Sequence, residues 1–191
     1  LGTSNVRFGV NAGNSIASGG NYNVVVGDEA GTGITTGNNN VAVGYVALRD
    51  NNTGGNNTAL GYASLVVNST GDDNTAVGFR SLYSNTTASN NTAVGKSALK
   101  ENTTGDDNTA TGSQSLQLNT TGSSNSAFGR YALLNNTTAS QNTAVGRSAL
   151  QETTTGANNT GLGYRALYLN TTGTQNVAVG AASLDANTTG N

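Results

Sequence analysis

The stretch Asn91–Gly105 reads N-T-A-V-G-K-S-A-L-K-E-N-T-T-G, and near copies of it recur along most of the chain. A second clear copy, Asn142–Gly156, reads N-T-A-V-G-R-S-A-L-Q-E-T-T-T-G. Successive copies follow a 17-residue period, as from Gly78 to Gly95. A fixed short period is the signature of a repeat architecture, so this pattern decides the fold before any other motif does.

We number each unit from the asparagine four places before its glycine, so that asparagine holds position 1 and glycine position 5. Position 4 is mostly Val, Leu or Phe, position 9 is Leu from Leu48 to Leu184, and positions 12 to 15 read Asn-Thr-Thr-Gly or close to it. The step from Gly9 to Gly27 is longer than the period by a single inserted residue. The chain therefore divides into divergent N-terminal coils (1–39) and regular 17-residue coils (40–191).

The composition excludes several classes of protein. The 191 residues include 27 glycines and no Pro, Cys, Met, Trp or His, with 34% hydrophobic and 9% charged residues. The apolar content is thin for a globular core, and the low charge is not that of a disordered chain. A net charge of −2 provides no basic footprint for nucleic acid, and no apolar run is long enough to span a bilayer.

The repeat unit favours β-structure. It is too short for a helical hairpin and shows no helical periodicity. It fits two short extended segments, at positions 1–4 and 7–9, with corners at the glycine and at the Asn-Thr-Thr-Gly stretch. The sequence therefore predicts an all-β fold, a parallel β-solenoid of about eleven coils.

Stacking places equal positions of successive coils above one another. Asparagine side chains stacked in this way can hydrogen-bond along the axis, which makes a structural ladder a better interpretation than a ligand site. The predicted ladder comprises Asn40, Asn57, Asn74, Asn91, Asn108, Asn125, Asn142, Asn159 and Asn176, with the glycines Gly44, Gly61, Gly78, Gly95, Gly112, Gly129, Gly146, Gly163 and Gly180.

One chain by itself buries little apolar surface per coil, which argues for an oligomer. Strands without charge on either face are usually covered on both faces. We therefore expect one strand face to fill the coil and the alanines of position 3 to meet a neighbouring chain, with a solvent-exposed alanine stripe as the alternative. The candidate inter-chain residues are Ala59, Ala76, Ala93, Ala110, Ala127 and Ala144.

A longer period, equal to three coils, overlies the short one as a 51-residue super-repeat. Acids recur at Asp50, Glu101 and Glu152, and apolar residues at Val67, Leu118 and Leu169. Duplication of a three-coil block explains this pattern, and contacts that repeat at every third coil are the alternative.

The motif N-T-A-V-G with a following A-L resembles the head repeats of YadA-like trimeric autotransporter adhesins. The longer pattern, as in Asn91–Gly105 and Asn142–Leu150, resembles repeats of bacteriophage tail fibres. The resemblance covers residues 40–191 well. It implies a left-handed β-roll, a homotrimer, and a structural or adhesive role, with no catalytic residue to carry over.

Motifs that would carry chemistry are scarce. The absence of His and Cys removes the usual nucleophiles and most transition-metal ligands, so we expect no enzyme, cofactor or metal site. Asp72–Asp73 and Asp106–Asp107 allow a calcium loop, although a solvated turn is the simpler interpretation. Asn-x-Thr sequons, as at Asn102, also suit plain turns. A loose basic stripe of solubilising or glycan-contacting type is formed by Lys96, Arg130, Arg147, Arg80 and Arg165.

The functional hypothesis is a structural and adhesive fibre, extracellular or on a virion, that binds itself and a surface glycan or protein receptor. The chain stops at Asn187–Asn191, where another coil would begin, which suggests a longer fibre or end-to-end assembly. The first alternative is a monomeric ice- or lattice-binding solenoid that uses the threonines of position 14. A glycan depolymerase is a third. The position-14 threonines are Thr87, Thr104, Thr121, Thr138, Thr155, Thr172 and Thr189.

Overall fold

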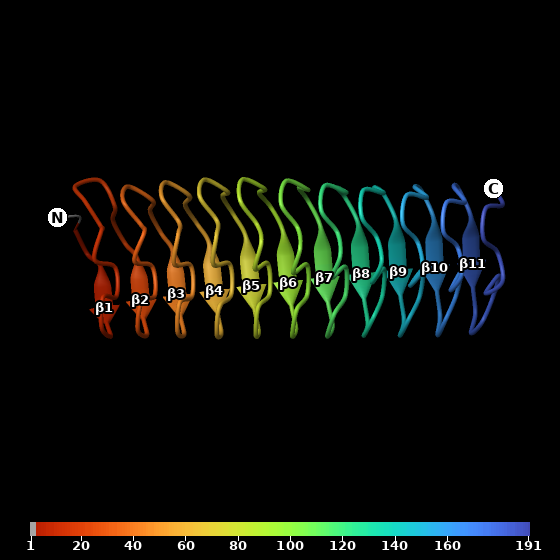
Figure 1. Cartoon of the computed structure of the whole chain (residues 1–191), viewed down its shortest axis with the longest axis horizontal. Coiled ribbons are helices and arrows are strands. Elements are labelled where there is room, and N and C mark those ends of the chain that lie inside the picture. Colours follow the sequence, from red (N-terminus) through yellow and green to blue (C-terminus); the bar gives the residue numbers. More distant parts are fainter. Residues whose placement is uncertain (1–2) are drawn as a thin grey trace.

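The computed structural model describes residues 3–191 as a single rod of stacked coils (Figure 1). Each coil contributes one three-residue strand, and the eleven strands form one parallel sheet in sequence order. This confirms the predicted all-β parallel solenoid. The strands are β1 Val6–Phe8, β2 Val24–Val26, β3 Val41–Val43, β4 Thr58–Leu60, β5 Thr75–Val77, β6 Thr92–Val94, β7 Thr109–Thr111, β8 Ser126–Phe128, β9 Thr143–Val145, β10 Thr160–Leu162 and β11 Val177–Val179.

The strand register follows the sequence period. Thr75 of β5 pairs with Thr92 of β6, one 17-residue step later. Val6 of β1 pairs with Val24 of β2, a step that includes the inserted residue. The insertion is thus absorbed between β1 and β2 without a break in the sheet. The divergent coils of residues 3–39 continue the same rod.

The prediction of a second extended segment at positions 7–9 is wrong. This part of the coil is a turn in which positions 7 and 9 have left-handed backbone, for example φ 56° at Ser97 and 49° at Leu99. Its N–H groups still bond to neighbouring coils, Ser97 N to Phe79 O at 2.9 Å and Leu99 N to Ser115 O at 3.0 Å. Inter-coil hydrogen bonds and burial of the leucine stabilise this left-handed conformation, which costs a non-glycine residue about 1 kcal/mol or more.

The core is a file of small and large side chains inside the coil. The alanines of position 3 and the leucines of position 9 belong to one buried cluster, and Leu99 and Ala93 are both fully buried. At Gly161, where position 3 lacks a side chain, an added Cβ would lie 3.2 Å from Cγ of Leu150. Position 3 therefore points inward, against the leucine of the preceding coil.

The first two coils fill the same space differently. They carry Gly13 and Gly31 at position 9, where later coils have leucine, and Ile16 and Ile34 at position 12, where later coils mostly have asparagine. A Cβ added at Gly31 would lie 2.8 Å from Cδ1 of Ile34. The isoleucine thus occupies the volume that the leucine fills elsewhere, which explains how these coils diverge in sequence and keep the fold.

The predicted asparagine ladder at position 1 is confirmed. Asn57 N donates to Oδ1 of Asn40 at 3.0 Å, and Asn74 N donates to Oδ1 of Asn57 at 3.0 Å. The side-chain Nδ2 of Asn57 donates to the carbonyl of Gly71 across its own coil at 2.8 Å. The asparagines of this ladder therefore link consecutive coils, and those from Asn40 to Asn176, except Asn91, also close their own coil in this way.

A second ladder runs at position 12, which we had assigned only to a corner. Asn68 Nδ2 donates both to Oδ1 of Asn51 at 2.7 Å and to the carbonyl of Gly71 at 2.8 Å. The same contacts continue to Asn136, and the ladder is then interrupted by Thr153. The two ladders satisfy polar groups inside a narrow coil, where an unpaired amide would be costly.

The position-5 glycines form a column of close backbone contacts. Gly95 has φ 136°, and a Cβ added to it would lie 2.6 Å from the carbonyl oxygen of Gly112 in the next coil. Both the torsion and the contact exclude a side chain. The invariance of glycine at this position along the chain is therefore structural.

Candidate functional site

The predicted inter-chain alanines do not reach the surface. Ala59, Ala76, Ala93, Ala110, Ala127 and Ala144 are all fully buried within the single chain. Because alternate residues of a strand point to opposite faces, the inward direction of position 3 turns positions 2 and 4 outward. The assignment of these alanines to another chain is wrong, and so is the alternative of an exposed alanine stripe.

We define the outward strand face as positions 2 and 4 of β1 to β11. It carries no charged residue: fourteen of its 22 side chains are Val, Leu or Phe, and the rest are Thr or Ser. Leu60, Phe128 and Leu162 are 46%, 43% and 44% exposed, which is unusual for large apolar side chains that repeat in register. The rod therefore presents an uncharged, partly apolar strip along its whole described length.

A second surface lies beyond the glycine column. We define the basic–aromatic face as positions 6, 7 and 10 of the coils of β3 to β10. It holds seven of the eight Lys and Arg residues, seven of the ten aromatic residues and no acid. Its cations are Arg49, Arg80, Lys96, Lys100, Arg130, Arg147 and Arg165, and its aromatic residues are Tyr45, Tyr62, Phe79, Tyr83, Tyr131, Tyr164 and Tyr168. A chain with net charge −2 thus concentrates its positive charge on one face.

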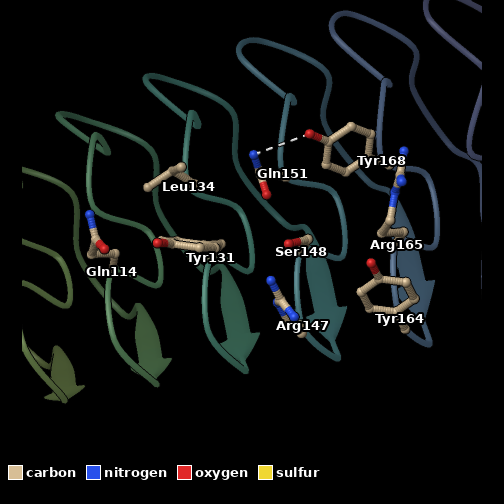
Figure 2. A pocket seen from close by; sticks show the side chains of 9 residues that line it. All are labelled: Gln114, Tyr131, Leu134, Arg147, Ser148, Gln151, Tyr164, Arg165 and Tyr168. Carbon is tan, nitrogen blue, oxygen red and sulfur yellow. Dashed lines mark hydrogen bonds between the residues drawn. The ribbon is translucent and has the colours of Figure 1, made fainter.

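A hollow on this face has a volume of about 420 Å³. Figure 2 shows Ser148 between Tyr131, one coil before it, and Arg165 with Tyr168, one coil after it. The small side chain of Ser148 leaves the space that larger residues fill in adjacent coils. Gln151 Nε2 lies 3.5 Å from the hydroxyl of Tyr168, and Gln114, Leu134, Arg147 and Tyr164 complete the lining.

A smaller hollow of about 210 Å³ lies five coils earlier. Ala63, Arg80 and Tyr83 line it, and these residues stand five repeat units before Ser148, Arg165 and Tyr168. The two hollows also differ. Glu29 lines the earlier one at the place where Gln114 lines the later one, and Tyr62 stands where Arg147 stands. Equivalent positions of the repeat therefore form a hollow at two places along the rod, and the larger hollow carries more positive charge.

Aromatic rings surround the arginines of both hollows. The guanidinium carbon of Arg165 lies 4.2 Å from the ring centroid of Tyr168, and that of Arg80 lies 5.2 Å from Phe79 and 5.5 Å from Tyr83. These are cation–π distances. The buried Nε atoms of Arg80 and Arg165 have no hydrogen-bond partner in the described part of the chain. Beside the smaller hollow, Tyr62 stacks on Phe79 with a centroid separation of 5.2 Å.

The acids of the three-coil period are used locally. Asp50 pairs with Arg49 at 2.7 Å and Glu101 pairs with Lys100, whereas Glu152 accepts from Gln151 Nε2 at 2.9 Å. The hydrogen bond from Arg49 to Asp50 raises the pKa of the Arg49 guanidinium. Two of the seven cations are therefore neutralised by the residue that follows them. Within residues 3–191, Arg80, Lys96, Arg130, Arg147 and Arg165 form no ion pair.

The other candidates are structural or isolated. Asp72 Oδ1 accepts from Gly55 N and Asp106 Oδ1 from Ser89 N, both at 2.7 Å, so one carboxylate of each predicted calcium pair caps a backbone group. No cluster of three or more potential metal ligands exists among the described residues.

Asn102, the example sequon, is fully buried in the second ladder, which shields its amide from modification. The position-14 threonines form an exposed file.

Across residues 3–191, no helix is both long and apolar enough to cross a membrane. No protein-family model matches the chain, and neither a curated protein nor a solved structure shows significant similarity to it.

Proposed function

We propose that this chain is a non-enzymatic structural and adhesive fibre that assembles with copies of itself outside the cell or on a virion. The observation that carries the proposal is the outward strand face, an uncharged strip with large exposed side chains such as Leu60 and Phe128. Exposed apolar patches of this extent mark interaction surfaces.

A second copy of the chain is the occupant that fits this strip best. Its side chains repeat at the inter-strand rise of about 4.8 Å. A partner must share that rise to remain in register along the whole rod, and another copy does so by construction. Packing of two or more such faces would bury Val77, Val94 and Val145, which one chain leaves partly exposed.

Three copies around a common axis, with a left-handed coil, constitute the specific form that we propose. This form follows the motif resemblance of Asn142–Leu150 to trimeric adhesin heads and tail-fibre repeats.

Mass in solution tests the proposal. One chain has a mass of 19.1 kDa, so light scattering should give about 57 kDa, three times that value, for the native protein. The variant Val77→Lys/Val145→Lys places charge in the proposed contact and should shift the mass to that of one chain. The control Thr87→Lys/Thr155→Lys adds the same charge on the exposed threonine file and should leave the mass unchanged. A folded native protein with the mass of one chain would refute the assembly.

An ice- or lattice-binding solenoid remains the second candidate because the position-14 threonines form a regular exposed file. The position-13 threonines beside them are already engaged, as in Thr86 Oγ1 donating to Thr103 O at 3.1 Å. Only one free file is thus available for a lattice. Thermal hysteresis of the native protein would favour this candidate, and its absence at high concentration would exclude it.

A further inference from the structure

We infer that the hollow around Ser148 on the basic–aromatic face is a binding site for an acidic polysaccharide, with Arg165 as the residue that meets the acid group. This inference rests on the adhesive part of the proposed function and gives it a ligand. The residues that line the hollow are at positions 6, 7 and 10, off the outward strand face of positions 2 and 4, so contact between outward strand faces leaves it accessible.

The charge distribution selects an anion. Arg147 and Arg165 both line the hollow, and no acid lines it. Neither arginine forms an ion pair with a described residue. The buried Nε of Arg165 has no hydrogen-bond partner, although such groups are normally satisfied. A ligand cannot reach this covered Nε, but the Nη groups at the end of the same guanidinium suit a carboxylate or sulfate group, which an arginine can bind with two parallel hydrogen bonds.

The aromatic rings select a sugar chain over a simple anion. Tyr131, Tyr164 and Tyr168 line the same hollow, and their phenol rings offer apolar faces next to hydroxyl groups. A pyranose ring has the matching character, with C–H groups on its faces and hydroxyls at its edge. A volume of about 420 Å³ accommodates a small number of sugar units and leaves both ends of a chain free.

The smaller hollow extends the argument along the rod. Arg80 and Tyr83 repeat the placement of Arg165 and Tyr168 five coils earlier, about 24 Å away at one strand spacing per coil. Lys96 and Arg130 lie on the face between the two hollows. A long acidic chain laid along the axis therefore meets positive charge in all but one of the coils between the hollows. Glu29 at the rim makes the earlier hollow the weaker of the two.

Nucleic acid suits this face less well. The closely spaced phosphates of a strand require neutralisation along their whole length. Here every third coil carries an acid at position 11, next to the cations of the face. These acids are Asp50, Glu101 and Glu152. An acidic polysaccharide with fewer charges per unit length avoids these carboxylates more easily.

Binding of polygalacturonate, measured by calorimetry at low salt, tests the inference. The native protein should bind it, should bind neutral dextran at least about tenfold more weakly, and should lose affinity as salt is added. The galacturonate trisaccharide should bind more weakly than the polymer because it reaches only one hollow. Tighter binding of oligo(dT) than of polygalacturonate would overturn the inference in favour of nucleic acid, and absence of binding to polygalacturonate would overturn it outright.

Matched variants locate the site. Arg165→Gln should weaken binding by about tenfold, the loss expected for one charge-assisted contact, and Arg80→Gln should weaken it less. Lys100→Gln removes the same charge outside both hollows and should change affinity by no more than about twofold. An equal loss in all three variants would show that general charge, and not the hollow, binds the ligand.

Light scattering of the same samples separates the two proposals. The Arg165→Gln protein should keep the mass of the native protein, because this residue lies off the outward strand face. If Arg165→Gln loses glycan binding and keeps the native mass, the result supports the glycan site and leaves the assembly untouched. A native protein with the mass of one chain contradicts the assembly alone.

Discussion

Asn136 and Thr153 occupy position 12 of consecutive coils, and Oδ1 of Asn136 and Oγ1 of Thr153 are both buried without a hydrogen-bond partner. One step earlier in the same ladder, Nδ2 of Asn136 donates to Oδ1 of Asn119 at 2.7 Å. Thr153 is thus the point where the second ladder is broken, because a threonine hydroxyl is too short to replace the amide.

Restoring that rung should stabilise the protein. In Thr153→Asn, Nδ2 would donate to Asn136 Oδ1, and the new Oδ1 would accept from Asn170. Satisfying one buried acceptor should raise the free energy of unfolding by about 1–3 kcal/mol, measured by urea denaturation. Thr155→Asn, a matched change at an exposed position, should have an effect within about 0.5 kcal/mol. A lower stability for Thr153→Asn would show that the site cannot accept the amide.

The glycine column provides the second prediction. Gly95→Ala should lower the free energy of unfolding by about 3 kcal/mol or more, because the backbone torsion is strained for alanine and its Cβ meets the carbonyl of Gly112 at 2.6 Å. Gly55→Ala is the control, since its Cβ would lie 3.2 Å from the nearest atom and other coils carry Ser89 or Ala157 at that position. Chemical denaturation of both variants should separate them clearly, and equal stabilities would contradict the proposed clash.

Position 17 gives a prediction about backbone strain at the surface. Gln141 is exposed and has φ 62°, a conformation that asparagine tolerates and β-branched residues resist. We expect Gln141→Asn to raise the free energy of unfolding by about 0.5 kcal/mol and Gln141→Val to lower it by about 1–3 kcal/mol. Thermal melts of the two variants beside the native protein check the order. A valine variant as stable as the asparagine variant would contradict the left-handed conformation.

An acid placed in the first ladder should make stability depend on pH. In Asn108→Asp, the side chain would lose the donor that now meets Gly122 O at 2.9 Å, and burial with a nearby carbonyl should raise the pKa of the new carboxyl in the folded state. The folded protein then binds the proton more tightly than the unfolded chain does.

The sign of that dependence follows from linkage. Stability should be highest below the unfolded pKa of about 3.9 and should fall as pH rises toward the folded pKa. Melting temperatures measured from acidic to neutral pH check this, with Thr104→Asp at an exposed position as the control. A variant whose melting temperature rises over that range, relative to the native protein, would contradict the buried ladder.

The sequence allowed much of this fold to be predicted. The 17-residue period fixed the stacking of coils, and the asparagine of position 1 was correctly interpreted as a ladder because its only plausible neighbours were its own copies. The ladder of position 12 was missed, although its asparagine recurs through most of the regular coils. It lies in an Asn-Thr-Thr-Gly stretch that is equally typical of a solvated turn, and composition alone does not separate the two.

The direction of the strand faces could not be derived from the sequence. Alanine and valine alternate at positions 3 and 4, and neither face carries charge, so the pattern does not mark which side is inside. The answer depends on Leu99 and its equivalents, whose left-handed backbone turns the leucine inward against alanine. Leucine rarely adopts that conformation, and no local rule predicts it.

The basic–aromatic face illustrates the same limit at the site. The sequence singled out Arg80 and Arg165 as part of a basic stripe, but it did not associate them with Tyr83 and Tyr168. The hollow beside each arginine arises from a small residue in the preceding coil, Ala63 or Ser148, which becomes a neighbour only through stacking. The recurrence of a small residue, an arginine and a tyrosine at the same spacing after five repeat units was the signal available in the sequence.

The central claim is that copies of this rod meet through their outward strand faces. Because the chain contains no cysteine, Val94→Cys introduces a single thiol on that face, and Ser123→Cys introduces one on a different surface. After mild oxidation at low protein concentration, Val94→Cys should form disulfide-linked pairs, leaving about one chain in three unlinked as a trimer requires, while Ser123→Cys stays unlinked. Equal cross-linking of the two variants, or none in Val94→Cys, would contradict the account.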